Sequence, residues 1–347
     1  MQTDWHLIFN NSIVSSEKLE KEIPVNTDEV KQVIAKYPMF INPYFLSLIK
    51  NNPALLKQSV PDLLELEDCN HILDPLDEEY QSPVPNLIHR YPDRVVFLVS
   101  NKCAIYCRYC MRKRLMGQKN NITHESIKRG LDYIAKNSSI KDVILSGGDP
   151  LLLEDDKIEA ILYKIRKIPH VDIIRIHTRI PCVLPQRIDF ALAATIKKYH
   201  PIFVNIHFNH PDEITEESSQ ACSILADAGI PLGSQTVLLK GINDNTETMT
   251  LLMRKLIKNR VKPYYIHHCD PVKSVSHFRT SIQKGIEIMK NLRGFVSGMC
   301  VPYYMIDIPK GGGKIPILPE YIEDYENSLL KVRNFKGEIF EYPNTLS

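Results

Sequence analysis

The chain has 347 residues, of which 44% are hydrophobic and 24% charged, so it can bury a sizeable core in one large domain or two. Its 43 basic and 41 acidic residues leave a net charge of +2, which excludes a global electrostatic field suited to nucleic acid or to an anionic membrane. No apolar run approaches the ~20 residues of a membrane helix and the N-terminus does not resemble a secretion signal, so we expect a cytoplasmic protein with no membrane or nucleic-acid partner.

The first 88 residues predict a helical region interrupted by prolines. Between Thr27 and Lys36, for example, a capping threonine precedes apolar positions at helical spacing. From Asp93 onward the pattern changes, because short runs rich in valine and isoleucine alternate with amphipathic stretches. The predicted strands are 95–100, 143–146, 173–177, 202–208, 234–239 and 264–268. The predicted helices are 124–136, 156–167, 188–199, 214–228, 245–259 and 280–292.

Continuous apolar strands separated by helices predict an α/β fold with a parallel sheet covered on its outer face. Six such units favour a partial (β/α)6 barrel. A doubly wound sheet is less suited, because the candidate sites follow successive strands. The tail alternates around Lys336 and Gly337 like a hairpin. We expect an N-terminal helical region at 1–88, the barrel at 89–300 and a C-terminal segment at 301–347.

Three cysteines, Cys103, Cys107 and Cys110, follow the first predicted strand with the spacing CxxxCxxC. Structural zinc and structural iron–sulfur sites normally use four protein ligands. Three cysteines with no obvious fourth therefore indicate a four-iron cluster whose open iron binds an exchangeable partner. A zinc knuckle or three reduced thiols in a loop are the simpler alternatives. We expect most of the scattered cysteines to be small core residues: Cys69, Cys182, Cys222, Cys269 and Cys300.

Two glycine segments follow later strands. Ser146–Asp149 closes the second predicted strand, where paired glycines expose backbone groups to a ligand, although a tight turn explains the same residues. Lys314 ends the run 311–313. A phosphate loop is excluded there, because Ile308 and Ile315 stand where glycine and a hydroxyl residue are required. A Schiff base between this lysine and pyridoxal phosphate is the sharper interpretation, and an ordinary surface loop is the alternative.

Together these motifs resemble the lysine 2,3-aminomutases, radical S-adenosylmethionine enzymes that also bind pyridoxal phosphate, from about His89 to Tyr321. The matching stretches are 89–94, 103–114, 146–149, 183–188, 207–211, 263–265 and 311–314. The resemblance implies a barrel of the radical S-adenosylmethionine type, a [4Fe-4S] cluster, S-adenosylmethionine and pyridoxal 5′-phosphate. The implied reaction interconverts α-lysine and β-lysine through a 5′-deoxyadenosyl radical, which moves the amino group between C2 and C3.

The resemblance also implies a role for each matching residue. Lys314 would form the Schiff base and Arg90 and Arg94 would clamp the cofactor phosphate, which suits the guanidinium fork. Arg112 would bind the substrate carboxylate, and Asp270 and Asp307 its ε-ammonium. The cluster would be bound by Cys103, Cys107 and Cys110, with S-adenosylmethionine near Tyr109, Ser146, Gly147, Gly148, Asp149 and Gln235.

Each of these residue types also has an ordinary explanation. On that explanation the two arginines that flank Tyr-Pro-Asp belong to a solvated turn, and the basic run 108–114 is a patch that binds nucleic acid. Each aspartate taken singly is a cap or turn residue, and Gln235 is a buried amide at the end of a strand. As a pair, however, Asp270 and Asp307 favour a cationic side chain over a dicarboxylate substrate such as glutamate, which would meet like charges.

The sequence departs from the longer aminomutases in three respects. His267 stands where they have tyrosine, Lys310 replaces the first glycine of their GGGGK loop, and their cysteine-bearing C-terminal extension, linked to zinc and assembly, is not seen. Homo-oligomerisation stays open for that reason. In its shorter length and in His267 the chain is similar to a sister group that supplies β-lysine for modifying elongation factor P. That group, however, lacks the full set of Asp270, Asp307 and the segment 311–314.

Three further hypotheses stay open at this point. One is a related aminomutase acting on another amino acid, and another is a radical S-adenosylmethionine enzyme that does not use pyridoxal phosphate. The third is a non-catalytic metal-binding module that binds RNA through the basic loop. For the enzyme we also expect an electron donor such as flavodoxin or ferredoxin.

Overall fold

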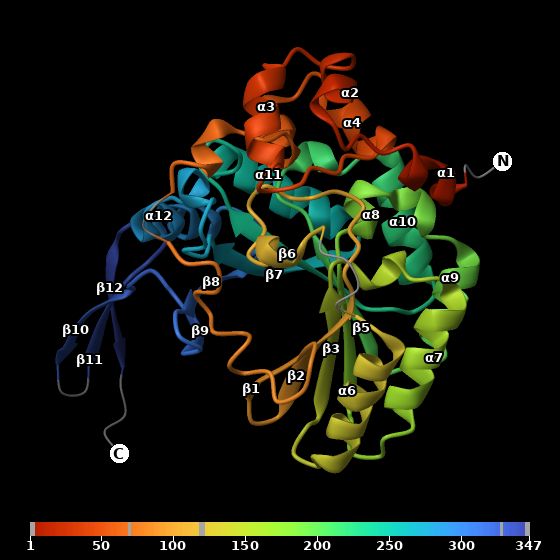
Figure 1. Cartoon of the computed structure of the whole chain (residues 1–347). Coiled ribbons are helices and arrows are strands. Elements are labelled where there is room, and N and C mark those ends of the chain that lie inside the picture. The colour runs from red at the N-terminus through yellow and green to blue at the C-terminus, as the bar shows by residue number, and fades with distance from the viewer. Residues whose placement is uncertain (1–3, 69–70, 118–121, 327–328, 344–347) are drawn as a thin grey trace.

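The computed structural model describes residues 4–68, 71–117, 122–326 and 329–343. Its centre is a curved nine-stranded sheet whose strands lie in chain order, β1 to β9 (Figure 1). Strands β2 to β8 are parallel, and β1 and β9 run antiparallel at the two edges. The strands are β1 Leu87–Tyr91, β2 Arg94–Ser100, β3 Asp142–Gly147, β4 Ile173–Thr178, β5 Ile202–His207, β6 Leu232–Leu238, β7 Val261–His268, β8 Tyr303–Ile308 and β9 Gly313–Pro316.

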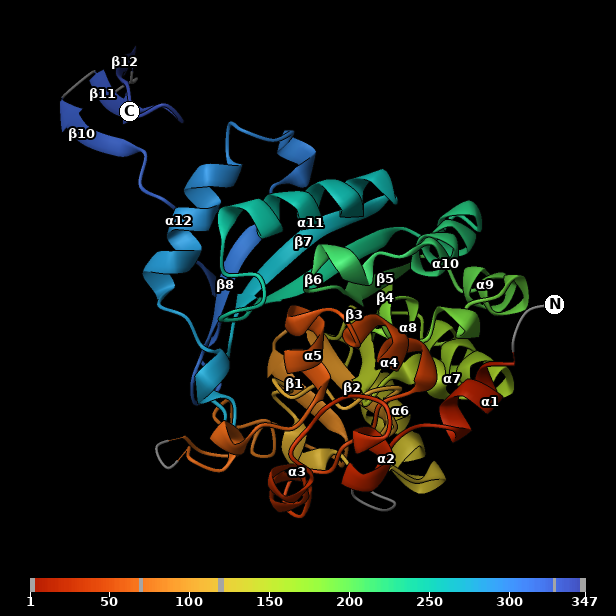
Figure 2. The same ribbon diagram turned by 90° about the horizontal axis from the view of Figure 1, so that it is seen from above.

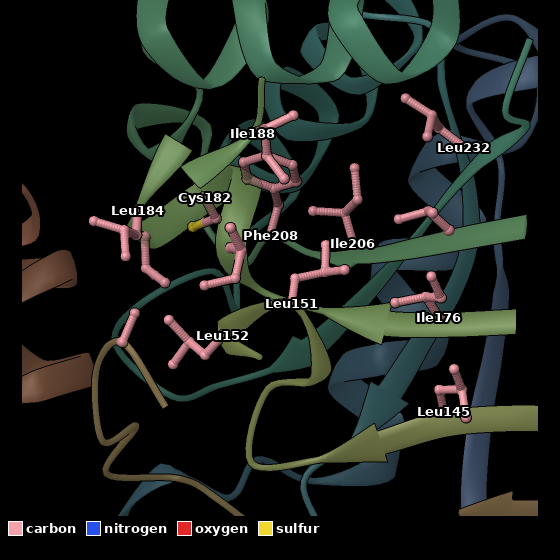
Figure 3. Close-up of a cluster of buried hydrophobic side chains, with 14 of the residues drawn as sticks. Leu145, Leu151, Leu152, Ile176, Cys182, Leu184, Ile188, Ile206, Phe208 and Leu232 are labelled. Carbon is pink, nitrogen blue, oxygen red and sulfur yellow. The ribbon is translucent and has the colours of Figure 1, made fainter. Parts of the chain in front are cut away.

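Helices connect the parallel strands and cover the outer face of the sheet. They are α6 His124–Lys136, α7 Asp155–Arg166, the short α8 Ile180–Val183, α9 Phe190–Lys197, α10 Glu216–Asp227, α11 Thr246–Lys258 and α12 Ile282–Leu292. Capping side chains start most of them; Thr123, for example, accepts a hydrogen bond from the Ser126 N–H at the start of α6. Apolar residues of the strands and of the elements around them form the main core, in which Leu145, Ile176 and Ile206 come from neighbouring strands (Figure 3), and a smaller cluster lies in the loops after β6 and β7.

All six predicted strands and all six predicted connecting helices are confirmed, with ends that differ by a few residues. The parallel strand β8 and the edge strands β1 and β9 were not predicted. Strand β8 carries Asp307 in its second half, which interrupts the apolar run that marks a buried strand. Strand β9 is only four residues long. The division of the chain at residues 88 and 300 stays a prediction.

The N-terminal helices lie together at one end of the barrel (Figure 1), as the prolines and caps predict. They are α1 Trp5–Asn10, α2 Ser16–Glu20, α3 Thr27–Ile34, α4 Pro43–Ile49 and α5 Pro53–Ser59. One detail was wrong: the cap of α3 is Asn26, whose side chain accepts two backbone N–H groups, and Thr27 is the first helical residue.

This helical region also supports the cysteine loop. The Tyr106 N–H donates to Phe40 O and the Arg108 N–H to Gln58 O, both at 2.9 Å. The buried Asn42 amide donates to the carbonyl of Ala104 at 2.9 Å. The loop between β2 and α6 is therefore fixed from outside by residues that precede the barrel.

A three-stranded sheet follows the barrel. It consists of β10 Ile322–Glu326, β11 Leu329–Arg333 and β12 Ile339–Pro343, and it projects beside α12 (Figure 2). The predicted hairpin is confirmed, since Arg333 pairs with Ile339 across a turn in which Gly337 has a φ of 89°. In the described ranges of the chain no helix has the length and apolar character needed to cross a bilayer.

The buried cysteines agree with the prediction. Cys182, Cys222, Cys269 and Cys300 are all buried and unpaired. Cys69 lies outside the described residues. The four described side chains fill space in the core as small apolar groups do.

A buried group of charges ties the cysteine loop to the N-terminal region. Glu65 accepts hydrogen bonds from Arg108 at 2.8 and 2.6 Å and from the Lys113 amine at 2.5 Å. Burial opposes ionisation of Glu65, but the charges of Arg108 and Lys113 keep the pKa of Glu65 below its usual range. Burial in turn lowers the pKa of Lys113 to about 8. One carboxylate therefore compensates two buried cations.

We expect Glu65→Ala to lower the free energy of unfolding of the cofactor-free protein by about 3–5 kcal/mol, because it leaves two buried cations uncompensated. Urea unfolding followed by circular dichroism measures this change. Glu159→Ala is the matched control, since Glu159 pairs with Lys198 on the surface and its loss should have little effect. Equal effects of the two substitutions would contradict the expectation.

Candidate active site

One cavity of about 410 Å³ lies at the carboxyl ends of the parallel strands, where the loops after them meet. Every residue predicted for the site lines it: Arg90, Arg94, Cys103, Cys107, Tyr109, Cys110, Arg112, Ser146, Gly147, Gly148, Asp149, Gln235, Asp270, Asp307 and Lys314. Residues far apart in the chain therefore face a single space. The role of each residue stays a prediction.

The three cysteines form one corner of the cavity and are partly exposed to it. Burial, and then the neighbouring cysteines, raise the pKa of Cys103 and Cys110, the latter to about 11. The Arg179 guanidinium donates a hydrogen bond to Cys107 Sγ at 2.8 Å. The three thiols come from one loop and line the same cavity, and cysteine thiolates are the usual ligands of iron–sulfur clusters, so this corner is where a cluster would be held.

The glycines of the segment 146–149 serve a close crossing of two loops. The Gly148 N–H donates to Ser100 O and the Asp149 N–H donates to Lys102 O, both at 2.7 Å. A Cβ atom would lie 2.1 Å from Ser100 O at Gly147 and 2.3 Å from Lys102 O at Gly148. The N–H groups of Gly148 and Asp149 are therefore used within the protein. The expectation that the segment offers its backbone groups to a ligand is wrong for these two groups.

Asp149 is buried and bonded within the protein. Its carboxylate accepts hydrogen bonds from Thr178 Oγ1 and from the Arg179 N–H, both at 2.7 Å. Burial raises the pKa of Asp149 to about 6 in spite of these bonds. Asp149 thus fixes the start of the loop after β4, which brings Arg179 to Cys107.

Lys314 lies on β9 directly opposite Asp307 on β8. Its ε-amine forms an ion pair with the Asp307 carboxylate, and its backbone N–H donates to the Tyr91 hydroxyl at 2.7 Å. Gly311 and Gly313, with φ of 74° and 86°, allow the tight turn between the two strands. The amine therefore lies at the cavity wall, which fits a residue that binds a cofactor carbonyl.

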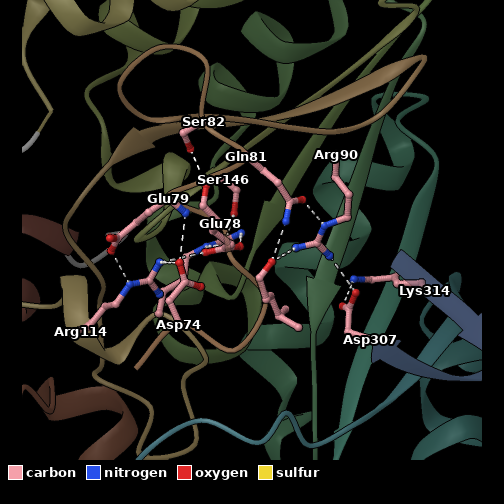
Figure 4. A network of polar contacts seen from close by, with 12 residues as sticks. Asp74, Glu78, Glu79, Gln81, Ser82, Arg90, Arg114, Ser146, Asp307 and Lys314 are labelled. Carbon is pink, nitrogen blue, oxygen red and sulfur yellow. Dashed lines mark hydrogen bonds and ion pairs between the residues drawn. The ribbon is translucent and has the colours of Figure 1, made fainter. Parts of the chain in front are cut away.

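The two arginines predicted to clamp a phosphate differ in their surroundings. Arg90 Nε donates to Gln81 Oε1 at 2.7 Å and Nη2 to Leu76 O at 3.0 Å (Figure 4). Arg90 Nη1 donates to Asp307 Oδ1 at 3.0 Å. Arg94, by contrast, is 41% exposed. The protein thus fixes the orientation of Arg90 and leaves Arg94 more accessible to an incoming anion.

Two aspartates face the same part of the cavity. Asp307 is paired with Arg90 and Lys314, whereas no hydrogen bond to the Asp270 side chain is present among the described residues. Burial, and then the charge of Asp307, raise the pKa of Asp270 to about 7. A cation placed between the two carboxylates would relieve their repulsion.

Arg112 is part-buried and lines the same cavity as the two aspartates. Its Nε and Nη2 donate to the Glu78 carboxylate at 3.0 and 2.7 Å, and its Nη1 reaches Ser146 Oγ at 3.4 Å. The charge of Asp307 is also among the causes that raise the pKa of Arg112 in spite of burial. The cavity therefore contains both a cationic and an anionic group suited to an amino acid with a charged side chain.

Sequence reasoning missed several cavity residues. Glu78 belongs to no motif and follows an irregular acidic stretch, so no signal pointed to it. His177 ends the predicted strand 173–177 and Arg179 follows it by two residues, which was an available signal. His177, His207 and His267 line the cavity, and burial lowers the pKa of all three, that of His207 to about 4, so they are neutral at pH 7.

Comparison with known proteins gives two family matches. The Radical SAM superfamily matches residues 97–252, and the family described as Lysine-2,3-aminomutase matches residues 289–346. The L-lysine 2,3-aminomutase of Clostridium subterminale is 48% identical over 99% of this chain and 85% of its own length. The glutamate 2,3-aminomutase of Clostridioides difficile is 44% identical (97% and 81% covered), and the L-lysine 2,3-aminomutase of Haemophilus influenzae 34% (87% and 91%). Since relatives named for different substrates are similarly close, identity alone does not fix the substrate.

We expect Gly148→Ala to reduce the iron bound after anaerobic reconstitution, because the added Cβ meets Lys102 O and displaces the loop that carries Cys103. Such overpacking lowers the free energy of unfolding by about 1–3 kcal/mol. Iron per chain and thermal unfolding are the measurements. In the control Gly298→Ala the added Cβ has no atom within 4 Å, so iron content should be unchanged. Full iron binding by Gly148→Ala would contradict the expectation, because it would mean that the two loops can move apart without displacing the cysteines.

Proposed function

The chain belongs to the lysine 2,3-aminomutase family of radical S-adenosylmethionine enzymes, and from this premise we propose that it interconverts α-lysine and β-lysine. It is an isomerase whose cofactors are a [4Fe-4S] cluster, S-adenosylmethionine and pyridoxal phosphate. When bound, the cluster and S-adenosylmethionine supply a radical that removes a hydrogen atom, and pyridoxal phosphate supplies a carbonyl carbon that carries the migrating nitrogen.

The observation that carries the choice of substrate is the pair of carboxylates, Asp270 and Asp307, in the same cavity as Arg112. Arg112 receives the α-carboxylate of the substrate, and the two aspartates receive its ε-ammonium. A dicarboxylate such as glutamate would place a second anion against Asp270, whose pKa is already raised by burial and by Asp307.

The remaining residues act on the cofactors. Cys103, Cys107 and Cys110 bind the cluster, and Tyr109, Gln235 and the segment 146–149 border S-adenosylmethionine. Lys314 would hold pyridoxal phosphate through its amine, and Arg90 and Arg94 would hold the cofactor phosphate. The part-enclosed cavity keeps water away from reactive intermediates and holds one C–H bond near the radical.

The partners follow from this chemistry. A low-potential electron donor such as flavodoxin or ferredoxin reduces the cluster, since cleavage of S-adenosylmethionine consumes an electron. We also propose a cytoplasmic location. Whether identical chains assemble stays open.

The proposal predicts β-lysine from lysine and no rearrangement of glutamate when protein reconstituted anaerobically with iron, sulfide and pyridoxal phosphate receives S-adenosylmethionine and dithionite. Mass spectrometry of the amino acids measures both. Lys314→Ala is the control that should lose activity together with the absorbance of the bound pyridoxal phosphate. Cleavage of S-adenosylmethionine without rearrangement of lysine would contradict the substrate assignment.

The KM for lysine should depend on pH through Asp270. The raised pKa means that Asp270 keeps its proton up to about pH 7 and is an anion above it. The ε-ammonium binds the anion, so KM should rise about tenfold as the pH falls from 8 to 6. In Asp270→Asn the KM should be high and independent of pH over this range. A wild-type KM that does not change would refute the role of Asp270.

A further inference from the structure

The segment 74–82, which we call the strap, borders the cavity through Leu76 and Glu78, and Gln81 of the strap lies against Arg90 (Figure 4). Leu76 O accepts a hydrogen bond from Arg90 Nη2 at 3.0 Å, and the Glu78 carboxylate binds Arg112. The backbone of the strap is itself fixed, because the Lys310 N–H donates to Pro75 O at 2.8 Å.

Glu78 and Arg112 form a two-pronged ion pair inside the protein. Their side chains are 6% and 14% exposed. Arg112 Nη2 donates to Glu78 Oε1 at 2.7 Å and Arg112 Nε donates to Oε2 at 3.0 Å. The carboxylate therefore occupies the edge of the guanidinium formed by Nε and Nη2.

The other edge of the guanidinium is less occupied. A guanidinium carries five N–H groups, and Glu78 accepts from Nε and Nη2. Nη1 makes one long contact, 3.4 Å, to Ser146 Oγ. The edge formed by Nη1 and Nη2 thus has N–H groups left to bind a second carboxylate, and Arg112 lines the cavity.

We propose that Glu78 is a positioning residue that holds one edge of Arg112 so that the other edge is turned toward the cavity to receive the α-carboxylate of the substrate. This inference rests on the proposed function, because it takes the substrate to be an amino acid bound through Arg112. Holding the long arginine side chain in one rotamer before the substrate arrives lowers the conformational entropy lost on binding.

The test compares two ligands that differ only at the carboxylate. L-lysinamide carries a neutral amide in its place and keeps both amines of L-lysine. Dissociation constants are measured in the reconstituted holoenzyme without reductant, from the change in absorbance of the bound pyridoxal phosphate. In Glu78→Gln we expect lysine to bind about tenfold more weakly and lysinamide nearly unchanged, because the closer of the two ion pairs of Glu78, 2.7 Å to Arg112 against 3.6 Å to Arg114, lies behind the carboxylate site.

Glu79→Gln is the matched control on the same strap. Glu79 is 74% exposed and contacts Arg114 Nε at 3.0 Å, so neither ligand should bind differently after this substitution. Glu78→Asp keeps the charge with a shorter reach, and we expect a weaker but selective loss of lysine binding. It also keeps the test open if Glu78→Gln does not fold, which circular dichroism would reveal.

Three outcomes would overturn the proposal. Tighter lysine binding in Glu78→Gln would mean that Glu78 competes with the substrate for Arg112. Equal losses for lysine and lysinamide would mean that Glu78 supports the cavity in general. Arg112→Gln separates the proposal from its premise: if that substitution leaves the preference for lysine over lysinamide intact, the assignment of Arg112 fails and the role of Glu78 fails with it.

Discussion

One topological constraint brings the site together: strands β2 to β8 run parallel and follow each other in chain order. Each strand therefore delivers its carboxyl end to the same end of the barrel, and the loop after each strand faces the same cavity. The strand order alone does not fix the cysteine loop. The N-terminal region fixes this loop from outside through backbone hydrogen bonds and the buried Glu65. The site depends on both parts of the chain although its residues come almost entirely from the barrel.

The charges of the cavity are balanced in pairs. Glu78 faces Arg112, Asp307 faces Arg90 and Lys314, and Glu213 pairs with the Arg179 that contacts a cysteine. Such pairing allows many ionic groups to lie close together in a partly buried space without a large net field. Asp270 has no such partner among the described residues, and burial and a neighbouring carboxylate both act against its ionised form. An unbalanced carboxylate of this kind favours a ligand that brings its own positive charge.

The sequence predicted the parallel sheet, because its buried strands are continuous apolar runs, and the site, because its motifs are local. It did not predict β8, where Asp307 interrupts the apolar run, or β9, which is too short to show a period. The glycine pair was identified, yet the reason for it was not, since the close crossing with residues 100–102 is a tertiary contact. Glu78 was missed for the same reason: its partner Arg112 is remote in sequence and no spacing rule connects them.

The strap has a consequence for how substrate preference can vary on this fold. A single short segment contacts Arg90 through Leu76 O and Arg112 through the Glu78 carboxylate, so the strap links the two arginines. Insertions or deletions there would shift both arginines at once. In the proposed function the strap would thus hold the residue for the cofactor phosphate, Arg90, and the residue for the substrate carboxylate, Arg112, in one frame. Differences in side-chain length and charge would then be accommodated around Asp270, which follows β7 and makes no hydrogen bond through its side chain to either arginine in the described part of the chain.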